Sequence, residues 1–289
     1  AAADLDRRTG RYDIDLDRVT FRYGPASAPV VADLSLRVPY RDHLAVIGPS
    51  GAGKSTLAAL LCGMLRPDAG TVRIGGRPAA YLAPADRGRT RVLIPQQAYV
   101  FAASVRENLT YLTGDAADVD DATVLAAAGA LGAGPLLADL GGLGAQLCPD
   151  RLSAGQRQLI ALVRAYLSPA KIMVLDEATC HLDPAAEALV EAALAARGGT
   201  LVVVAHRISS ARRAARILLL DGDQVLVGEH PSLLAGSRLY RDLTGHWTGT
   251  GPPMPEPTGT GPPVLEPTGV GGDLHGLDPG PGADLSVDP

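Results

Sequence analysis

Short apolar runs alternate with helical stretches along most of the chain. Two runs, Leu44–Ile47 and Ile172–Leu175, are apolar at every position, as expected of strands that are buried on both faces. The other β-type runs are Leu34–Val38, Thr71–Ile74, Val92–Ile94, Leu201–Ala205, Ile217–Leu220 and Val225–Val227. Helical patterns follow Lys54 and cover Ala154–Leu167 and Pro184–Ala196. This alternation predicts an α/β fold with a mainly parallel sheet.

Three segments depart from this alternation. Residues 1–12 are polar, and we interpret them as a linker before a folded body at 13–245. Ser104–Pro149 is rich in Ala, Gly and Leu without a clear strand, which predicts an inserted helical subdomain at about 104–165. After Trp247 the sequence TGTGPPMPEP repeats as TGTGPPVLEP. Pro and Gly at this density form no packed core, so we expect 246–289 to be a disordered acidic tail.

The charge of the chain is concentrated at its end. From Gly245 onward there are six acidic residues and no Lys or Arg, whereas the whole chain has 26 basic and 31 acidic residues. The folded body is therefore nearly neutral, and we expect no nucleic-acid partner. Hydrophobic residues make up 46% of the sequence, which is enough for a sizeable core.

The sequence gives no sign of secretion or of a membrane span. The three cysteines, Cys62, Cys148 and Cys180, are too scattered for a disulfide framework or a zinc site, which favours a reducing cytoplasm. We interpret Cys62 and Cys148 as packing residues. The charged start lacks the apolar core of a signal peptide, and the longest uncharged run, Ala122–Ala138, contains three Gly and a Pro. The chain begins at Ala1, so it is either a processed native start or part of a longer polypeptide.

A phosphate-binding motif follows the first fully apolar run. The pattern GxxxxGK[ST] is matched by Gly48, Pro49, Ser50, Gly51, Ala52, Gly53, Lys54 and Ser55. Glycines let backbone N–H groups surround phosphate oxygens, and the helix that follows presents its positive end. Lys54 is expected to reach the β- and γ-phosphates, and Ser55 to bind Mg²⁺. The alternative is a glycine-rich turn with an incidental lysine, although only Lys54 and Lys171 among the 26 basic residues are lysines.

Two carboxylates follow the second fully apolar run, at Asp176 and Glu177. Ligands gather at the carboxyl ends of the strands in a parallel sheet. Asp176 is therefore expected to face the Mg²⁺ held by Ser55, and Glu177 to polarise the water that attacks the γ-phosphate. An acidic pair at a solvated strand end is the alternative, and the phosphate motif favours the functional interpretation.

Leu152–Gln158, with the sequence LSAGQRQ, resembles the LSGGQ signature of ABC ATPases. Four further matches occur in the family's order. Tyr23 matches the aromatic residue that stacks on adenine, and Gln96 matches the glutamine that touches Mg²⁺ and the interface with the membrane domain. Ala178–Asp183 matches the loop that meets the partner subunit, and His206 matches the switch histidine that contacts the γ-phosphate.

The resemblance covers residues 13 to about 243 and implies a P-loop NTPase core, an N-terminal antiparallel β-subdomain around Tyr23 and an inserted α-helical subdomain. It implies ATP and Mg²⁺ as ligands, with Glu177, His206 and Gln96 as the catalytic residues. The positions implied to contact nucleotide are Tyr23, Gly48, Pro49, Ser50, Gly51, Ala52, Gly53, Lys54, Ser55, Thr56, Ser153, Gly155 and Gln156. The implied ligands of Mg²⁺ are Ser55, Gln96 and Asp176.

The resemblance also implies two partners. Two copies are expected to pair head to tail, with each ATP between the phosphate loop of one copy and Ser153 and Gly155 of the other. A transmembrane domain is expected at the cytoplasmic face of the membrane, and Asn108 and the run from His206 to His230 look like the domains fused behind exporter membrane domains. A soluble ABC-type ATPase and a module that binds ATP without hydrolysing it remain as alternatives. The first usually has two ATPase units or a long coiled coil, and Glu177 and His206 argue against the second.

Three parts of the sequence depart from the family pattern. Ala154 replaces a signature glycine, and its methyl group is expected to crowd the partner's γ-phosphate slightly. Gly144–Arg151 lacks the usual exporter motif with its Glu, which leaves the coupling to a membrane domain open. Cys180 and His181 are unusual in their loop; we interpret them as packing at the subunit interface, with a metal or redox role as the alternative.

Overall fold

The structure is a computed structural model, and it describes residues 12–114, 119–221 and 224–247. The predicted tail, apart from its first two residues, and all but the last residue of the predicted linker lie outside these ranges, so both predictions stay untested.

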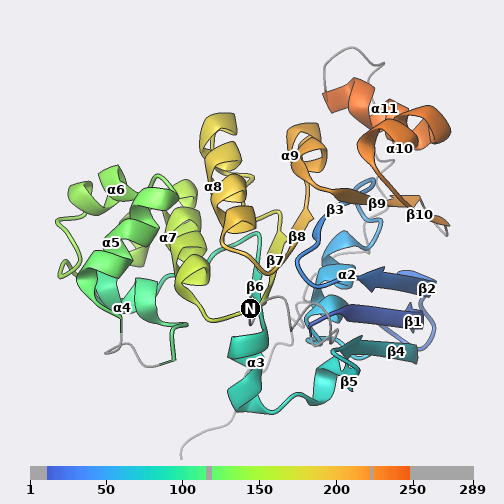
Figure 1. Ribbon diagram of the computed structural model, residues 1–289, viewed down its shortest axis with the longest axis horizontal. Helices are drawn as coiled ribbons and strands as arrows, with labels where there is room; N and C mark the ends of the chain where they lie inside the picture. The colour runs from blue at the N-terminus through green and yellow to red at the C-terminus, as the bar shows by residue number, and fades with distance from the viewer. Residues whose placement is uncertain (1–11, 115–118, 222–223, 248–289) are drawn as a thin grey trace, which may run out of the picture. The chain divides into compact units, whose positions relative to one another are not determined.

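Strands and helices alternate through the described residues (Figure 1). The strands are β1 (Ile14–Phe21), β2 (Val31–Val38), β3 (His43–Ile47), β4 (Ala69–Ile74), β5 (Arg77–Pro78), β6 (Arg91–Ile94), β7 (Ile172–Asp176), β8 (Thr200–Val204), β9 (Arg216–Asp221) and β10 (Gln224–Gly228). The helices are α2 (Lys54–Leu61), α3 (Pro84–Thr90), α4 (Val105–Thr110), α5 (Asp121–Ala130), α6 (Gly134–Asp139), α7 (Ala154–Leu167), α8 (Pro184–Ala196), α9 (Ile208–Arg213), α10 (His230–Gly236) and α11 (Arg238–Trp247), with 3₁₀ turns η1 (Ala79–Tyr81) and η3 (Pro149–Arg151).

The strands form two sheets. The first sheet is four-stranded, with the order β2-β1-β4-β5, and its neighbours are antiparallel. The second is six-stranded, with the order β10-β9-β3-β8-β7-β6, and all its neighbours are parallel except β10 and β9. The predicted α/β fold, with a mainly parallel sheet and an antiparallel N-terminal portion, is confirmed.

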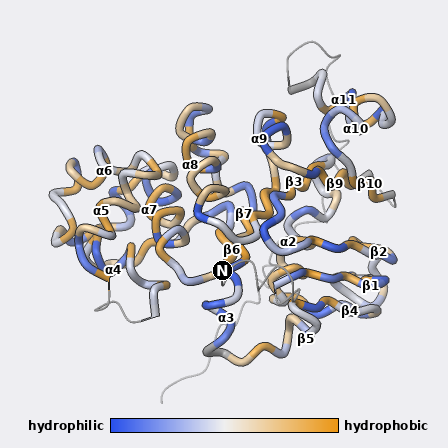
Figure 2. The backbone as a smooth tube through the Cα atoms, in the orientation of Figure 1, coloured by the Kyte–Doolittle hydropathy of each residue, from blue (hydrophilic) through white to orange (hydrophobic). Residues whose placement is uncertain are grey.

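The central strands of the parallel sheet bury both faces. In β7, Ile172 and Val174 face a core shared with α2 and the antiparallel sheet, whereas Met173 and Leu175 face a core shared with α4, α5 and α7. Figure 2 shows hydrophobic residues along the strands of this sheet. Burial on both sides explains why these runs are apolar without alternation.

The predicted helical insertion contains α4, α5, α6 and α7, which lie side by side in Figure 1. Helix α4 contacts α5 and α7, and α5 also contacts α6 and α7. Ser104 and Glu107 form a reciprocal capping box that starts α4, and Asp120 caps α5. Helix α7 continues to Leu167, beyond the predicted limit of 165. The limits of a separate subdomain therefore stay a prediction.

Other details differ from the sequence predictions. Strand β1 is not among the predicted strand runs. It is irregular, since Arg18 has a positive φ of 46° and the pairing with β2 shifts register between Leu16 and Val19. The predicted end of the folded body at Gly245 is too early, since α11 continues to Trp247. Cys62 is buried as expected, but Cys148 is exposed, so its interpretation as a packing residue is wrong. Among the helices that the structure describes, none has the length and apolar character needed to cross a bilayer.

Acid should destabilise this fold through His43, at the start of β3. Burial, together with the charge of Arg213, lowers the pKa of His43 from 6.5 to about 4. Below pH 6.5 the unfolded chain therefore binds a proton that the folded chain does not bind until about pH 4. The stability associated with His43 is complete above this window and is lost as the pH falls through it, by up to about 2 kcal/mol near pH 5.

Thermal unfolding between about pH 7 and pH 5 checks this expectation. The His43→Gln variant should lose less stability on acidification than the wild type, because the glutamine does not titrate. An equal loss in both proteins would assign the acid sensitivity to other groups.

Candidate functional site

The phosphate-motif loop joins β3 to α2, and its shape requires glycine at two positions. Gly53 has a φ of 85°, and a Cβ atom on it would lie 2.8 Å from Val30 Cγ1 and 2.9 Å from the Val30 carbonyl oxygen. A Cβ atom on Gly48 would lie 2.7 Å from the Leu220 carbonyl oxygen. Gly51 also has a positive φ, of 80°, but has open space around it. The loop is therefore folded tightly against its neighbours, which disfavours an incidental glycine-rich turn.

Lys54, the first residue of α2, holds its ammonium group inside the loop. Nζ donates to the carbonyl oxygens of Gly48 at 3.0 Å and of Pro49 at 2.8 Å. Burial lowers the pKa of Lys54, and the charges of Glu177 and Asp176 act in the opposite direction. The loop thus holds a half-buried cation at the start of a helix, where an anion is favoured. Within the same loop, Ser50 is exposed and Ala52 is half-buried.

Ser55 and Asp176 meet across the end of the parallel sheet. The Ser55 hydroxyl donates to Asp176 Oδ1 at 2.9 Å. Burial raises the pKa of Asp176, and the charge of Glu177 raises it further, while the Ser55 hydrogen bond and Lys54 act against this shift. A hydroxyl and a carboxylate are hard oxygen donors of the kind that Mg²⁺ prefers.

Glu177 directly follows β7 in a strained conformation. Its φ is 51°, in the left-handed region that is uncommon for residues other than glycine. Such strain costs on the order of 1–3 kcal/mol and often marks functional sites. Glu177 Oε2 accepts a hydrogen bond from Gln96 Nε2 at 3.0 Å. Gln96 follows β6, which pairs with β7, so the pair lies at the carboxyl ends of adjacent parallel strands.

An exposed aromatic ring lies beside the start of α2. The Tyr23 and Thr56 hydroxyls share a hydrogen bond of 3.0 Å. The ring packs edge-on against Phe21, with 5.1 Å between centroids, while 68% of the Tyr23 surface stays exposed. The structure therefore places an exposed aromatic ring beside the phosphate-motif loop, at the start of α2.

The signature residues lie at the start of α7. Ser153 Oγ accepts from the Gln156 backbone N–H at 3.2 Å, and Gln156 Oε1 accepts from the Ser153 backbone N–H at 2.8 Å. A Cβ atom on Gly155 would lie 3.0 Å from the His181 carbonyl oxygen, so α7 begins against the loop that follows Glu177. The backbone N–H and the side chain of Gln156 thus both take part in the capping box of α7. Across the described residues, no hydrogen bond or ion pair joins Ser153 or Gly155 to the phosphate-motif loop.

His206 is exposed and follows β8 after Ala205. Strand β8 lies between β3 and β7, so its carboxyl end shares the sheet edge that carries Lys54 and Glu177. No hydrogen bond or ion pair joins His206 to another residue in the part of the chain that the structure describes. Its predicted role is therefore compatible with its place in the topology and stays a prediction.

One buried network connects the Gln96 segment to α4 and α7. Asn108 is fully buried; its Nδ2 donates to the carbonyl oxygens of Phe101 and Ser104, and its Oδ1 accepts from Arg164 Nη2 at 3.0 Å. Arg164 also donates to the carbonyl oxygens of Asn108 and Tyr99. The sequence had marked Asn108 only by its likeness to exporters, and Arg164 gave no signal because its partners are distant along the chain.

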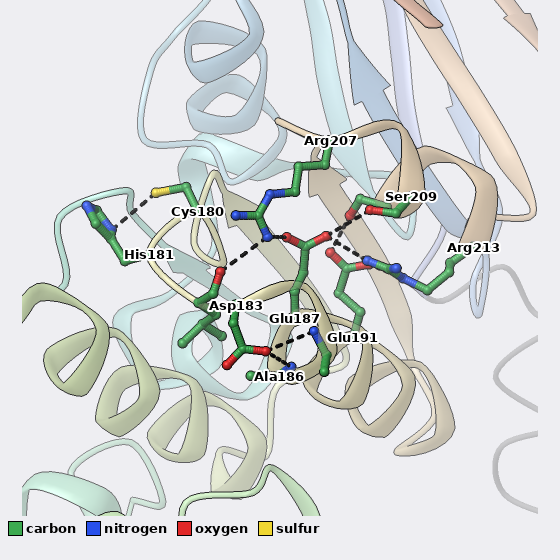
Figure 3. A network of polar contacts seen from close by, with 12 residues as sticks. Cys180, His181, Asp183, Ala186, Glu187, Glu191, Arg207, Ser209 and Arg213 are labelled. Carbon is green, nitrogen blue, oxygen red and sulfur yellow. Dashed lines mark hydrogen bonds and ion pairs between the residues drawn. The ribbon is translucent and has the colours of Figure 1, made fainter. Parts of the chain in front are cut away.

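A second buried network, joining α8 to α9, was also missed (Figure 3). It contains Glu187, Glu191, Arg207 and Arg213, and its signal in the sequence was two glutamates four residues apart on a predicted helix. Nearby, Cys180 Sγ lies 3.2 Å from His181 Nδ1. The described residues contain no group of three or more His, Cys, Asp or Glu side chains that could hold a metal ion.

Comparison with known proteins gives consistent matches. A family model described as ABC transporter matches residues 31–180. The ABC transporter ATP-binding protein RamB of Streptomyces coelicolor is 55% identical over 234 residues, which cover 81% of this chain and 38% of RamB. An ATP-dependent lipid A-core flippase of Alcanivorax borkumensis is 37% identical over 237 residues, covering 80% of this chain and 40% of the flippase.

A solved structure agrees with these matches. A bacterial Atm1-family ABC exporter with ATP bound superimposes with a TM-score of 0.76 at 28% sequence identity. The match covers 83% of this chain and 43% of the exporter chain. The chain therefore spans about 40% of the length of these relatives.

Two glycine substitutions test the geometry of the phosphate-motif loop. Gly51→Ala and Gly53→Ala both place a side chain at a φ near 80°, which costs about 1–2 kcal/mol. Only Gly53→Ala also drives a Cβ atom into Val30, so it should lower the melting temperature by more. Each additional 1 kcal/mol corresponds to roughly 2–4 °C. Differential scanning calorimetry checks the order, and equal losses would contradict the close contact with Val30.

Proposed function

This chain belongs to the ABC transporter family, and from that premise we propose that it binds ATP with Mg²⁺ and hydrolyses the ATP to ADP and phosphate. The observation that carries the proposal is the meeting of Lys54, Ser55, Asp176 and Glu177 at one end of the parallel sheet. These four residues supply a phosphate-binding cation, a pair of hard oxygen donors and a carboxylate for the attacking water.

In this proposal the triphosphate lies in the loop from Gly48 to Ser55. Backbone N–H groups of the loop donate to the phosphate oxygens, and Lys54 exchanges its bonds to the Gly48 and Pro49 carbonyl oxygens for bonds to phosphate. Adenine stacks on the exposed face of Tyr23, which contributes on the order of 1–3 kcal/mol by analogy with base stacking. The Thr56 hydroxyl holds the Tyr23 ring at the start of α2.

The residues present fit a magnesium site. Ser55 and Asp176 already lie together, and Gln96 donates through Nε2 to Glu177, which leaves its carbonyl oxygen for a cation. Burial raises the pKa of Asp176, so a bound cation would favour its ionised form. When bound there, Mg²⁺ neutralises the negative charge on the phosphate oxygens.

Glu177 is the proposed base. Its carboxylate orients water for attack on the γ-phosphorus and accepts a proton as the bond to the bridging oxygen of ADP breaks. Gln96 fixes the carboxylate by its hydrogen bond of 3.0 Å. His206, on the neighbouring strand end, contacts the γ-phosphate in the proposed reaction.

The site is proposed to be completed by a second copy of the chain. Ser153 is exposed, and Gly155 lies in the first turn of α7. Because the Ser153 backbone N–H donates to Gln156, the Ser153 hydroxyl and the Gly155 backbone N–H are the proposed donors to an anion. Neither is bonded to the phosphate-motif loop of its own chain within the described residues. Each would therefore meet the γ-phosphate held by the partner.

We further propose that this hydrolysis powers export through a membrane domain at the cytoplasmic face of the membrane. The relatives named for transport include a lipid A-core flippase and an Atm1-family ABC exporter. The chain matches less than half of the length of each, which suits the ATP-binding portion of such a transporter.

Glu177→Gln tests the chemistry. The amide keeps the size of the side chain but does not accept the proton, so hydrolysis should slow by about 10²–10⁴-fold while ATP binding is retained. Steady-state phosphate release and equilibrium binding of ATP measure the two effects. Glu229→Gln, which changes an exposed carboxylate before α10, is the matched control and should hydrolyse ATP normally. Hydrolysis by Glu177→Gln near the wild-type rate would remove Glu177 from the mechanism.

Ser153→Asp tests the shared site. Aspartate still caps α7, but it places a carboxylate where the partner's γ-phosphate is proposed to lie. The control is Ser232→Asp, at an exposed position on α10. The wild type and this control should dimerise when ATP is added, most clearly when the chain also carries Glu177→Gln. Ser153→Asp should stay monomeric while still binding ATP. Analytical ultracentrifugation decides, and an ATP-dependent dimer of Ser153→Asp would contradict the shared site.

A further inference from the structure

In the network of Figure 3, two buried carboxylates form ion pairs with two guanidinium groups. Glu187 and Glu191, both on α8, have only 2% and 1% of their surfaces exposed. Arg207 and Arg213 come from the segment that follows β8. Charges of this kind are expensive to bury, and a buried ionic network is weak evidence for stability alone. Its geometry therefore calls for another explanation.

Arg207 connects two loops of the proposed catalytic site. Its Nη1 donates to Glu187 Oε2 at 2.8 Å and to the Leu182 carbonyl oxygen at 3.2 Å. Leu182 ends the turn that begins at Glu177, since the Cys180 N–H donates to the Glu177 carbonyl oxygen and the Leu182 N–H to that of Thr179. Arg207 is also the residue directly after His206.

The acceptor for Arg207 is itself held in place. Glu187 Oε1 accepts from Arg213 Nη2 at 2.8 Å and from the Ser209 hydroxyl at 3.4 Å. Arg213 Nε donates to Glu191 Oε2 at 2.8 Å, and the Ser210 hydroxyl donates to Glu191 Oε1. These bonds hold the Glu187 carboxylate in one orientation. The Arg207 guanidinium, which donates to this carboxylate, is therefore held at Glu187 on α8.

We propose that Arg207 is a positioning residue for ATP hydrolysis, which holds His206 at a fixed position relative to the loop that carries Glu177. The inference rests on the proposed function. Its physical basis is that a backbone shift of about 1 Å between two reacting groups lowers the rate by as much as 10²-fold. Since no hydrogen bond or ion pair joins the phosphate-motif loop or Tyr23 to the network in the described residues, ATP binding should be spared.

The experiment is a double-mutant cycle between Arg207→Gln and His206→Ala in the 289-residue chain. Steady-state hydrolysis is measured over a range of ATP concentrations, which gives kcat and KM, and rates are corrected for the folded fraction. Arg207→Gln should lower kcat by about 10–100-fold and leave KM within about twofold. In the His206→Ala background the same substitution should have little further effect, because Arg207 acts through His206.

Two further variants separate positioning from stability. Tyr240→Phe removes a hydroxyl on α11 that hydrogen-bonds to His230 outside the network, so it should lower the melting temperature with kcat nearly unchanged. Arg207→Lys keeps the charge, but its side chain is shorter and lacks the planar guanidinium that places Nη1 between the two acceptors, so its kcat should be intermediate. If Arg207→Gln does not fold, Arg207→Lys replaces it in the cycle.

Three results for Arg207→Gln would each overturn the inference. The first is an unchanged kcat, and the second is a loss of kcat that is fully additive with that of His206→Ala. The third is a rise in KM that parallels the loss of stability. Glu177→Gln, measured alongside, separates this failure from failure of the proposed function. If the wild type hydrolyses ATP and Glu177→Gln does not, the function stands and the cycle judges Arg207 alone. If Glu177→Gln hydrolyses like the wild type, the proposed function fails and the inference fails with it.

Discussion

The parallel pairing of β3, β8, β7 and β6 is the constraint on which the rest of the site depends. Parallel strands point the same way, so all four carboxyl ends lie at one edge of the sheet. Lys54, Gln96 and His206 follow β3, β6 and β8, and Asp176 is the last residue of β7. Groups up to about 150 residues apart along the chain are therefore brought together by backbone hydrogen bonds that involve none of their side chains.

Once gathered, the polar groups partly compensate one another. Burial lowers the pKa of Lys54 and raises that of Asp176, and each charge opposes the shift of the other. The Ser55 hydroxyl supports the carboxylate by a direct hydrogen bond. Glu177 keeps a strained backbone, stabilised by the tight turn that follows it. In the proposed reaction, carboxylates held in this way would need little reorganisation.

Two buried networks attach the loops of this edge to the surrounding helices. Asn108 and Arg164 hold the segment after Gln96 against α4 and α7, and Arg207 with Glu187 holds the segments after Glu177 and His206 against α8. In both, a guanidinium group donates to a side chain and to backbone carbonyl oxygens at once. This use of arginine suits a planar group with several fixed donors.

The sequence by itself determined whatever is encoded within a few neighbouring residues. The phosphate-motif loop, the doubly buried strands and the capped start of α7 all follow from local spacing, because backbone conformation and burial pattern are set by adjacent residues. Only the tertiary structure decided that Arg164 meets Asn108, 56 residues away, and that Arg207 joins Leu182 to Glu187. Such contacts depend on where the sheet places the helices, and the neighbouring sequence does not distinguish these arginines from arginines at the surface. The irregular β1 was indistinct for the same reason, since its pairing depends on β2 and β4.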